Sequence, residues 1–293
     1  MSETQREGLV VRRYGGFYYV FTGEAVLACK LRGKIRDQVV TGDRVVITVL
    51  GTGTGVVEKV LPRRTELVRP RIANVDKVFI VFSCNCPEPS LVLLDRLLVL
   101  ASCHGLYPYI VLNKCDLDPA PRAVDIIDYY PRAGYKLILT SAVNGEGIDE
   151  VVKEVEGSIS VLAGPSGVGK SSLLNAVFPD RYLPTQEISE KTGRGRHTTR
   201  HVELFSLENG GWIADTPGFS VMDLPRMKRE DLARHFIEFE PLAAYCRFAD
   251  CLHYQEENCA VKESVSRGEI AQFRYQNYCS FLGEVIEAER CYR

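Results

Sequence analysis

The sequence predicts a multidomain chain with an N-terminal β-barrel, a central α/β domain and a mostly helical C-terminal domain. Short strands separated by glycine-rich turns occupy residues 7–61, which is the pattern of a small barrel. From residue 77 longer apolar strands alternate with helical segments, as in a parallel sheet that is covered on both faces. A cluster of cysteine and histidine then precedes a final helix. We therefore expect domains at 1–66, 67–225 and 226–293.

The composition fits a globular chain with substantial cores, because 45% of the 293 residues are hydrophobic. The first ten residues, MSETQREGLV, are polar, and there is no later apolar run of about eighteen residues, so we expect no export signal, no membrane span and a cytoplasmic location. In such a reducing compartment the tight cysteine cluster is better explained by a metal site than by disulfides. We also expect a monomer.

Five strands are expected in the N-terminal barrel: GLVVRRY, GFYYVF, AVLACKL, DRVVITVL and GVVEKVL. Five short strands in about sixty residues suit the OB-type barrel, a fold that often binds nucleic acid. This part of the chain is also basic, because residues 1–66 carry 11 Lys and Arg against 7 Asp and Glu, whereas residues 67–225 carry 15 against 19. The alternative is a generic barrel adaptor. Side chains that favour RNA binding are Arg32, Lys34, Arg36, Tyr18 and Tyr19.

The segment PRRTELVRPR, residues 62–71, interrupts the strand pattern and is expected to be a linker. Beyond it we expect strands at KVFIVFS, YPYIVLNK, YKLILTSA and SISVLAG, and helices at LVLLDRLLVLASCHG, GIDEVVKEVEG and KSSLLNAVF. Helical stretches around REDLARHF and from about residue 268 to 289 follow in the C-terminal domain. Ligands of parallel sheets bind beyond the carboxyl ends of the strands, and the motifs described next lie at such ends.

The stretch GPSGVGKS, residues 164–171, matches the phosphate-binding pattern G-x-x-x-x-G-K-[ST] between a strand and a helix. Its glycines let backbone N–H groups close around phosphates, and the helix N-terminus adds partial positive charge. Lys170 is expected to reach the β- and γ-phosphates, and Ser171 to ligate Mg²⁺. The predicted nucleotide contacts of this loop are Gly164, Pro165, Ser166, Gly167, Val168, Gly169, Lys170, Ser171 and Ser172.

A second motif, DTPG at residues 215–218, follows another apolar strand. Asp215 is expected to hold Mg²⁺ through water, and the amide of Gly218 to sense the γ-phosphate. An ordinary turn has the same composition, but the phosphate loop in the same chain favours the nucleotide interpretation.

The stretch NKCD, residues 113–116, predicts that the base is guanine. Asp116 can accept hydrogen bonds from the ring N–H and the exocyclic amine of guanine, a pair of donors that adenine lacks. Asn113 can bond the opposite edge, and Lys114 can lie along the ring. The following TSA stretch offers a backbone amide for the guanine carbonyl oxygen, and its predicted contacts are Ser141 and Ala142.

The order of these motifs is unusual, because the guanine-reading stretch precedes the phosphate loop, whereas ordinary GTPases place the phosphate loop first. A circular permutation accounts for the order: joining the natural termini of a compact sheet and cutting elsewhere preserves the site. We therefore expect the central domain to be a circularly permuted P-loop GTPase. The loop that begins at Asp215 then leads directly into the C-terminal domain and can act on it when the γ-phosphate is lost.

The cysteine and histidine cluster has the spacing C-x4-C-x-H-x5-C. Three thiolates and one imidazole select Zn²⁺, and four protein ligands leave no position for water, so we expect one structural zinc ion. Buried free cysteines are the alternative. The predicted ligands are Cys246, Cys251, His253 and Cys259.

The whole chain resembles the bacterial ribosome small-subunit-dependent GTPase A family (RsgA/YjeQ). The resemblance rests on RGKIR, RPRIANVDKV, NKCD, TSA, GPSGVGKSSLLN, GRGRHTTRHVEL, DTPGF and the cysteine cluster, in this order along the chain. It implies a factor in late maturation of the small (30S) ribosomal subunit. Such a factor binds the subunit and its rRNA with GTP, hydrolyses GTP to GDP and phosphate when the subunit stimulates it, and then dissociates.

The stretch SEKTGRGRHTTRHVEL, residues 189–204, is expected to be a switch segment that γ-phosphate and Mg²⁺ order. Either of two threonines can supply the hydroxyl, and three arginines can instead contact rRNA phosphates. Phe219 stands where many GTPases carry a glutamine that orients the attacking water, so we expect slow intrinsic turnover. His197 is a candidate to complete the site, with RNA or solvent contact as its alternative. The residues expected to take part in hydrolysis are Lys170, Ser171, Thr198, Thr199, Asp215, Gly218 and His197, and the three arginines are Arg194, Arg196 and Arg200.

Two other functions are compatible with parts of the sequence. An RNA-binding scaffold could retain a nucleotide site without catalysis, but the complete phosphate loop argues against it. An enzyme that uses ATP is opposed by Asp116, because its carboxylate would be left unpaired against adenine.

Overall fold

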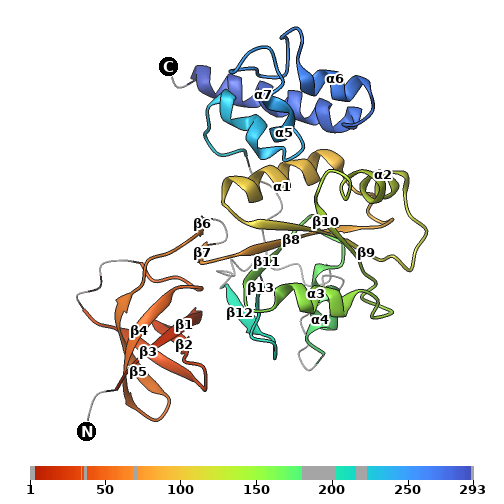
Figure 1. Cartoon of the computed structure of the whole chain (residues 1–293). Helices are drawn as coiled ribbons and strands as arrows, with labels where there is room; N and C mark the ends of the chain where they lie inside the picture. The colour runs from red at the N-terminus through yellow and green to blue at the C-terminus, as the bar shows by residue number, and fades with distance from the viewer. Residues whose placement is uncertain are drawn as a thin grey trace.

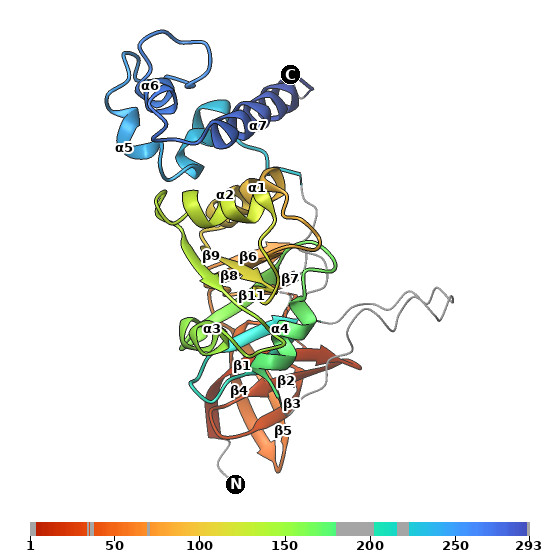
Figure 2. The same cartoon turned by 90° about the vertical axis from the view of Figure 1, so that its right-hand side faces the viewer.

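A computed structural model describes residues 4–33, 35, 38–68, 71–179, 202–215 and 223–291. The barrel, a sheet with helices and a helical C-terminal part follow one another in Figure 1. In the view of Figure 2 the central sheet lies between the barrel and the C-terminal part. The side chain of Asp215 lies outside the described residues, as do Lys34, Arg36, Arg194, Arg196, His197, Thr198, Thr199, Arg200, Gly218 and Phe219.

The barrel consists of β1 (Thr4–Tyr14), β2 (Phe17–Phe21), β3 (Val26–Leu31), β4 (Arg44–Gly51) and β5 (Thr54–Val60). β1 pairs with both β2 and β4, and β3 pairs in parallel with β5, so the strands close in the order β1-β2-β3-β5-β4. Apolar side chains that alternate with exposed ones fill the interior, among them Val10, Val20, Ile47 and Val57. The predicted five-stranded barrel is confirmed.

The prediction that residues 62–71 form a linker is wrong. Within and just beyond this segment, β6 (Glu66–Val68) and β7 (Arg71–Ala73) pair as a hairpin. The guanidinium of Arg63 donates to the buried carboxylate of Asp43 at 2.7 and 2.9 Å, which ties the segment to the barrel. This partner lies 20 residues away in the sequence, so the local pattern gave no sign of it.

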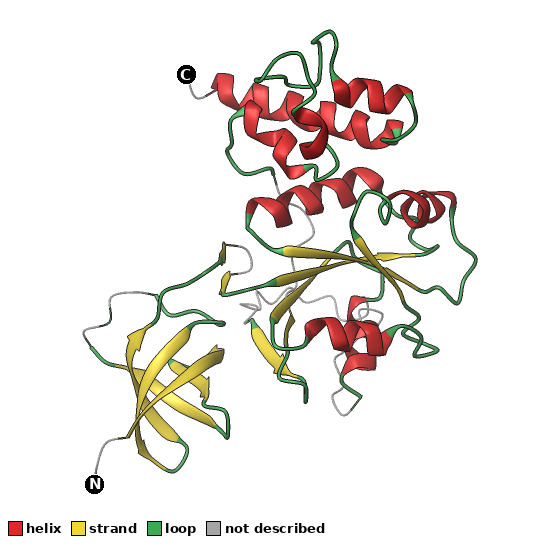
Figure 3. Cartoon of the chain, viewed as in Figure 1, coloured by secondary structure: helices red, strands yellow, loops and turns green. Residues whose placement is uncertain are grey.

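The central domain confirms the predicted alternation of strands and helices, and it adds two elements that were not predicted, the helix α2 and the strand β12. Its sheet has the order β10-β9-β8-β11-β13-β12, in which only β12 is antiparallel to its neighbour. Figure 3 shows helices on both faces of this sheet. The elements are β8 (Lys77–Ser83), α1 (Leu91–Cys103), β9 (Tyr107–Asn113), α2 (Pro121–Tyr129), β10 (Lys136–Leu139), α3 (Ile148–Val155), β11 (Ile159–Ala163), α4 (Lys170–Val177), β12 (Glu203–Ser206) and β13 (Trp212–Asp215).

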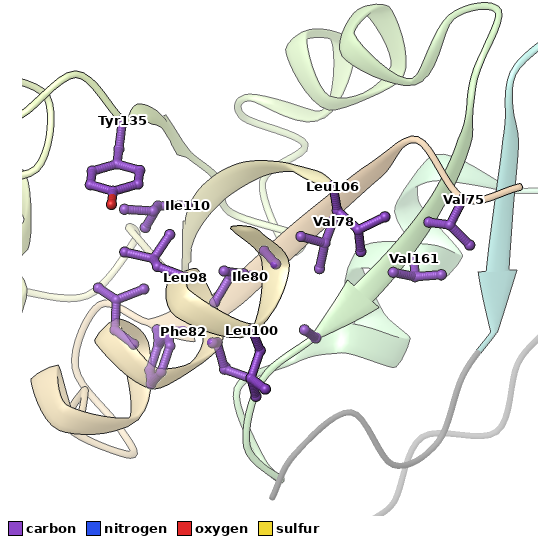
Figure 4. Packing of buried hydrophobic residues seen from close by; sticks show 14 of the residues in the cluster. Val75, Val78, Ile80, Phe82, Leu98, Leu100, Leu106, Ile110, Tyr135 and Val161 are labelled. Carbon is purple, nitrogen blue, oxygen red and sulfur yellow. The ribbon is translucent and has the colours of Figure 1, made fainter. Parts of the chain in front are cut away.

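The strand β8 explains how the permuted order still gives one site. It is buried on both faces: Val78, Ile80 and Phe82 pack under α1 (Figure 4), while Phe79 and Val81 belong to the core on the side of α3 and α4. β8 lies between β9, which ends in the guanine-reading stretch, and β11, which leads into the phosphate loop. Pieces far apart in the sequence therefore meet at one edge of the sheet.

The C-terminal part contains a 3₁₀ helix η2 (Arg229–His235) and the helices α5 (Glu240–Ala243), α6 (Ala260–Ser266) and α7 (Gln272–Cys291). The last helix begins four residues later than predicted, and REDLARHF forms η2. Phe236, Phe239 and Phe281 fill its core, which also receives Val99 from α1. Among the described residues, no helix combines the length and apolar character that crossing a bilayer requires.

A buried ion-pair network joins the C-terminal part to the central domain. The side chains of Arg274 and Asp95 are both fully buried, and the guanidinium donates to Asp95 Oδ1 at 2.5 Å. Its Nε donates to Glu238 Oε1 at 2.6 Å. The Tyr130 hydroxyl and the Asn277 amide also donate to Asp95. Helices α1 and α7 therefore share a polar interface in addition to their apolar contacts.

Candidate functional site

The predicted phosphate loop lies between β11 and α4, and two of its glycines are required by close contacts. At Gly164, where φ is +132°, a Cβ would lie 2.1 Å from the carbonyl oxygen of Val81. At Gly169, where φ is +92°, a Cβ would lie 2.3 Å from Asn113 Nδ2. Only glycine fits positions with such backbone angles and such neighbours. The loop is thus packed directly against β8 and against the guanine-reading stretch.

Lys170 is the first residue of α4, and its ammonium lies inside the loop. Nζ donates to the carbonyl oxygens of Gly164 at 2.9 Å and Pro165 at 2.5 Å. Burial lowers the pKa of Lys170, because the charged form loses hydration. Ser171 and Ser172 follow in the first turn of α4 and remain partly accessible. A cation and a helix N-terminus therefore converge where phosphate is expected.

Asn113 connects the two ends of the predicted nucleotide site. Its Nδ2 donates to the carbonyl oxygen of Val168 at 3.1 Å, and its Oδ1 accepts from Thr140 Oγ1 and from the amide of Ala142, both at 3.2 Å. The side chain is 1% exposed. In the structure its contacts thus lie within the protein, where they fix the guanine-reading stretch against the phosphate loop.

Lys114 provides a second connection between these two segments. Its backbone has φ of +66°, and Nζ donates to the carbonyl oxygens of Cys86 at 2.6 Å and Gly167 at 2.8 Å. The aliphatic part of the side chain therefore spans from the guanine-reading stretch to the phosphate loop. Sequence analysis did not identify the carbonyl of Cys86 as part of the site. The signal was present, because Cys86 follows the carboxyl end of the apolar strand β8, and the other motifs also lie at such strand ends.

Asp116 is exposed, and its orientation is set by Ser141. The Ser141 hydroxyl donates to Asp116 Oδ1 at 2.6 Å, and the amide of Asn144 donates to the same hydroxyl at 3.2 Å. A carboxylate held in this way at the rim of the site can accept the paired donors of guanine. Within the TSA stretch, the amide of Ala142 donates to Asn113 Oδ1, and the contact of a backbone amide of this stretch with the guanine carbonyl stays a prediction.

The strand that carries the predicted Mg²⁺ motif lies beside the phosphate-loop strand. β13 pairs in parallel with β11, with Val161 opposite Ala214. The backbone of Asp215 therefore ends its strand at the same edge of the sheet where the phosphate loop begins. The remainder of the motif and residues 189–201 of the predicted switch segment lie outside the described residues, so their roles stay predictions. The end of that segment, residues 203 and 204, begins strand β12 and is not a loop.

The four predicted metal ligands come together in the C-terminal part. Their donor atoms all lie within 4.8 Å of one another, and Cys246 Sγ is 3.8 Å from Cys259 Sγ. His253 Nδ1 is 3.5 Å from Cys246 Sγ and 3.3 Å from Cys259 Sγ. A tetrahedral zinc ion holds sulfur and nitrogen ligands about 3.6–3.8 Å apart. The donor set therefore fits a structural zinc ion in both chemistry and spacing.

Helix α7 anchors the loop that carries two of these ligands. The Tyr275 hydroxyl donates to the carbonyl of His253 at 2.9 Å, and the Tyr278 hydroxyl donates to the carbonyl of Leu252 at 2.6 Å. Burial raises the pKa of the Cys251 thiol, whereas a metal binds the thiolate. Binding of an ion must therefore release protons.

Comparisons with known proteins agree with this arrangement. The family described as RsgA GTPase matches residues 60–225, and the RsgA N-terminal domain matches residues 7–57. The chain is 50% identical over 289 residues to a protein of Moorella thermoacetica named small ribosomal subunit biogenesis GTPase RsgA, with 98% of this chain and 99% of that protein covered. It is also 50% identical over 288 residues to a protein of the same name from Carboxydothermus hydrogenoformans, with 97% and 99% covered.

Two solved structures share the fold over almost the full length. YjeQ from Thermotoga maritima superimposes with a TM-score of 0.83 at 37% identity, covering 97% of this chain and 99% of that one. YloQ, described as a circularly permuted GTPase, gives a TM-score of 0.83 at 35% identity, covering 97% and 96%. The predicted resemblance and the predicted permutation are confirmed. The chain therefore belongs to the RsgA GTPase family.

Proposed function

We propose that this chain is a GTPase that acts in the biogenesis of the small ribosomal subunit and hydrolyses GTP to GDP and phosphate. The observation that carries the GTPase assignment is the double connection made by Asn113 and Lys114, which joins a guanine-reading carboxylate and a phosphate loop into one site. The role in the small subunit is supported by the names of relatives that are half identical over nearly the whole chain.

In this proposal the loop from Gly164 to Ser172 binds the phosphates through its backbone N–H groups and Lys170, and Asp116 selects guanine with support from Ser141. Ser171 and Asp215, with Thr198 or Thr199, hold Mg²⁺, which when bound neutralises charge on the β- and γ-phosphates. Gly218 donates its amide to the γ-phosphate. These roles match the chemistry of the side chains and the positions of the described ones.

The proposal includes stimulation by the subunit, because Phe219 cannot orient the attacking water. His197 or a group from the bound subunit completes the site. The barrel, residues 1–66, contacts rRNA, residues 67–225 bind GTP, and residues 226–293 hold one Zn²⁺. The factor binds with GTP, leaves with GDP as a monomer, and works in the cytoplasm with the subunits that it serves.

Steady-state GTP turnover with and without purified mature small subunits tests the function. We expect slow turnover that rises many-fold with subunits and is abolished in Lys170→Ala, the control for contaminating GTPases. Turnover that subunits leave unchanged would contradict the ribosomal role. A wild-type rate no higher than that of Lys170→Ala would contradict the GTPase and favour a non-catalytic scaffold.

Base recognition is tested separately with Asp116→Asn. An amide at this position can donate to the carbonyl oxygen that replaces the exocyclic amine in xanthine, so the variant should prefer XTP to GTP. Binding measured with fluorescent guanine and xanthine nucleotides gives the ratio directly. An unchanged preference would show that Asp116 does not read the base.

A further inference from the structure

The barrel and the GTPase sheet meet in a row of three residues on three neighbouring strands. Arg12 of β1 pairs with Glu203 of β12, and Glu203 pairs with Asp215 of β13. Neighbouring strands lie about 4.8 Å apart, so the backbone of the barrel at Arg12 is roughly 10 Å from the backbone of Asp215. Figure 1 shows β12 on the barrel side of the central sheet. The barrel is therefore mounted on the edge that leads to the predicted Mg²⁺ residue.

Side-chain contacts also hold β12 to the barrel. The Arg12 guanidinium lies 3.4 Å from Glu203 Oε1 and 4.2 Å from the centre of the Tyr19 ring. Thr41 is only 5% exposed, and its hydroxyl donates to the carbonyl oxygen of Val202 at 3.0 Å. β12 is thus held by β1 through one ion pair and by a separate barrel loop through one hydrogen bond.

The two cores also meet here. Val10 belongs to the barrel core, whereas Val11, whose side chain points to the opposite face of β1, belongs to the core of the central domain. The register between β1 and β2 also shifts between Val10 and Arg12. Phe21 of β2 contacts Trp212 of β13 edge to face, with ring centres 5.1 Å apart. Apolar packing of this kind makes the junction resist hinge motion more than a flexible linker does.

We propose that Arg12 and Thr41 are positioning residues for the hydrolysis reaction: they hold β12, and through it the Asp215 end of β13, to the barrel. A partner bound to the barrel then fixes the strand end from which the Mg²⁺ loop starts. This inference rests on the proposed function, which places the small subunit on the barrel. It supplies a physical route by which that subunit stimulates a site that lacks a water-orienting glutamine.

Charge reversal at the junction tests the proposal. Arg12→Glu and Glu203→Arg should each lower kcat at saturating small subunits, and the exchange of both charges should restore it. Because an ion pair with this exposure contributes little free energy, we expect each single variant to lower this kcat by a factor of about two to five. Turnover without subunits, measured at saturating Mg²⁺, should change less than the stimulated turnover. Arg6→Glu is the matched control, because Arg6 lies on the same strand and pairs with the exposed Glu24 at 3.0 Å, within the barrel.

A readout without subunits separates this inference from the proposed function. Trp212 is the one tryptophan of the chain, so its emission reports the junction when Mg²⁺ and a non-hydrolysable GTP analogue are added. We expect an emission change in the wild type, and a higher Mg²⁺ midpoint in the variant that combines Arg12→Glu with Thr41→Val. Thr41→Val keeps the shape and removes the hydrogen bond.

The outcomes are distinct. Subunits that fail to stimulate the wild type would contradict the proposed function, whereas Trp212 would still test the junction. Stimulation that is equal in the wild type and in both charge-reversal variants would overturn the positioning role. Trp212 emission of the wild type that does not change on addition of Mg²⁺ and nucleotide would also overturn the positioning role. Loss of kcat that the charge exchange fails to restore would show that Arg12 acts through some other contact.

Discussion

Replacing Arg274 with methionine is expected to destabilise the whole chain strongly. The guanidinium is fully buried and donates to Asp95, to Glu238 and to the Tyr135 hydroxyl at 2.8 Å, and it lies 4.3 Å from the centre of the Phe236 ring. Methionine can fill much of the volume and keep the apolar contacts. It leaves two carboxylates, one fully buried and one nearly so, without their cation.

The magnitude follows from this imbalance. Removing one partner of a buried ion pair typically costs about 3–5 kcal/mol, because the remaining charge loses its compensation. The net value of the intact pair is much smaller, so a variant that also carries Asp95→Asn and Glu238→Gln should recover a large part of the loss. Arg234→Met is the matched control, because Arg234 is exposed and forms a surface ion pair with Asp231 at 3.2 Å, where ion pairs contribute little.

Urea unfolding followed by far-UV circular dichroism measures these changes, with the slope of the transition compared between variants. We expect the single variant to unfold at markedly lower urea, the triple variant to lie between it and the wild type, and the control to match the wild type. A single variant as stable as the control would refute the reasoning, since it would mean that Asp95 and Glu238 do not depend on Arg274 for compensation.

Three further outcomes are expected. Ser141→Ala should weaken GDP binding about five-fold, as measured by fluorescence anisotropy, because Asp116 loses a hydrogen bond worth roughly 1 kcal/mol; unchanged affinity would show that the hydroxyl does not orient the carboxylate. Cys259→Ser should lower the bound zinc measured by elemental analysis and destabilise the C-terminal part, while GTP affinity persists; full zinc content would exclude Cys259 as a ligand. Burial lowers the pKa of Lys170 below 10.5, and bound phosphate favours its charged form, so GTP binding takes up a proton at Lys170. GTP affinity should therefore fall as the pH rises through the lowered pKa. A pH profile of GTP affinity that is flat and that Lys170→Arg does not alter would contradict this.

Much of the fold could be predicted because the relevant signals are local. β8 is apolar along its whole length and is buried on both faces, and the phosphate loop is defined by eight consecutive residues. The short strands β6 and β7 have three residues each, too few for an alternating pattern to be recognised. The contact of Arg63 with Asp43 that orders the supposed linker is equally invisible in a local window.

The sequence identified the residues of the candidate site more completely than it identified the contacts that they make. The segments that carry Asp116 and Lys170 are joined by the hydrogen bonds of Asn113 and Lys114, whereas the nucleotide contacts of both residues stay predictions. The side chain of Asn113, however, is used within the protein, because the loops that approach it present two carbonyls, a hydroxyl and an amide. Arg274 and Asp95 are 179 residues apart, and nothing local distinguishes them from charged residues on an exposed helix face.

The position of β8 between β9 and β11 has a consequence for synthesis of the chain. β8 is complete at Ser83, whereas its neighbour β11 is complete only at Ala163, an interval of roughly 4 to 16 seconds at typical rates of translation. The nascent sheet therefore grows from its centre with one side open, and nucleotide cannot act as a folding ligand until the phosphate loop, residues 164–171, has been made, when more than half of the chain exists. In an unpermuted arrangement the phosphate loop would emerge first, so the rearranged order delays ligand-assisted folding until the barrel and four of the six strands of the central sheet already exist.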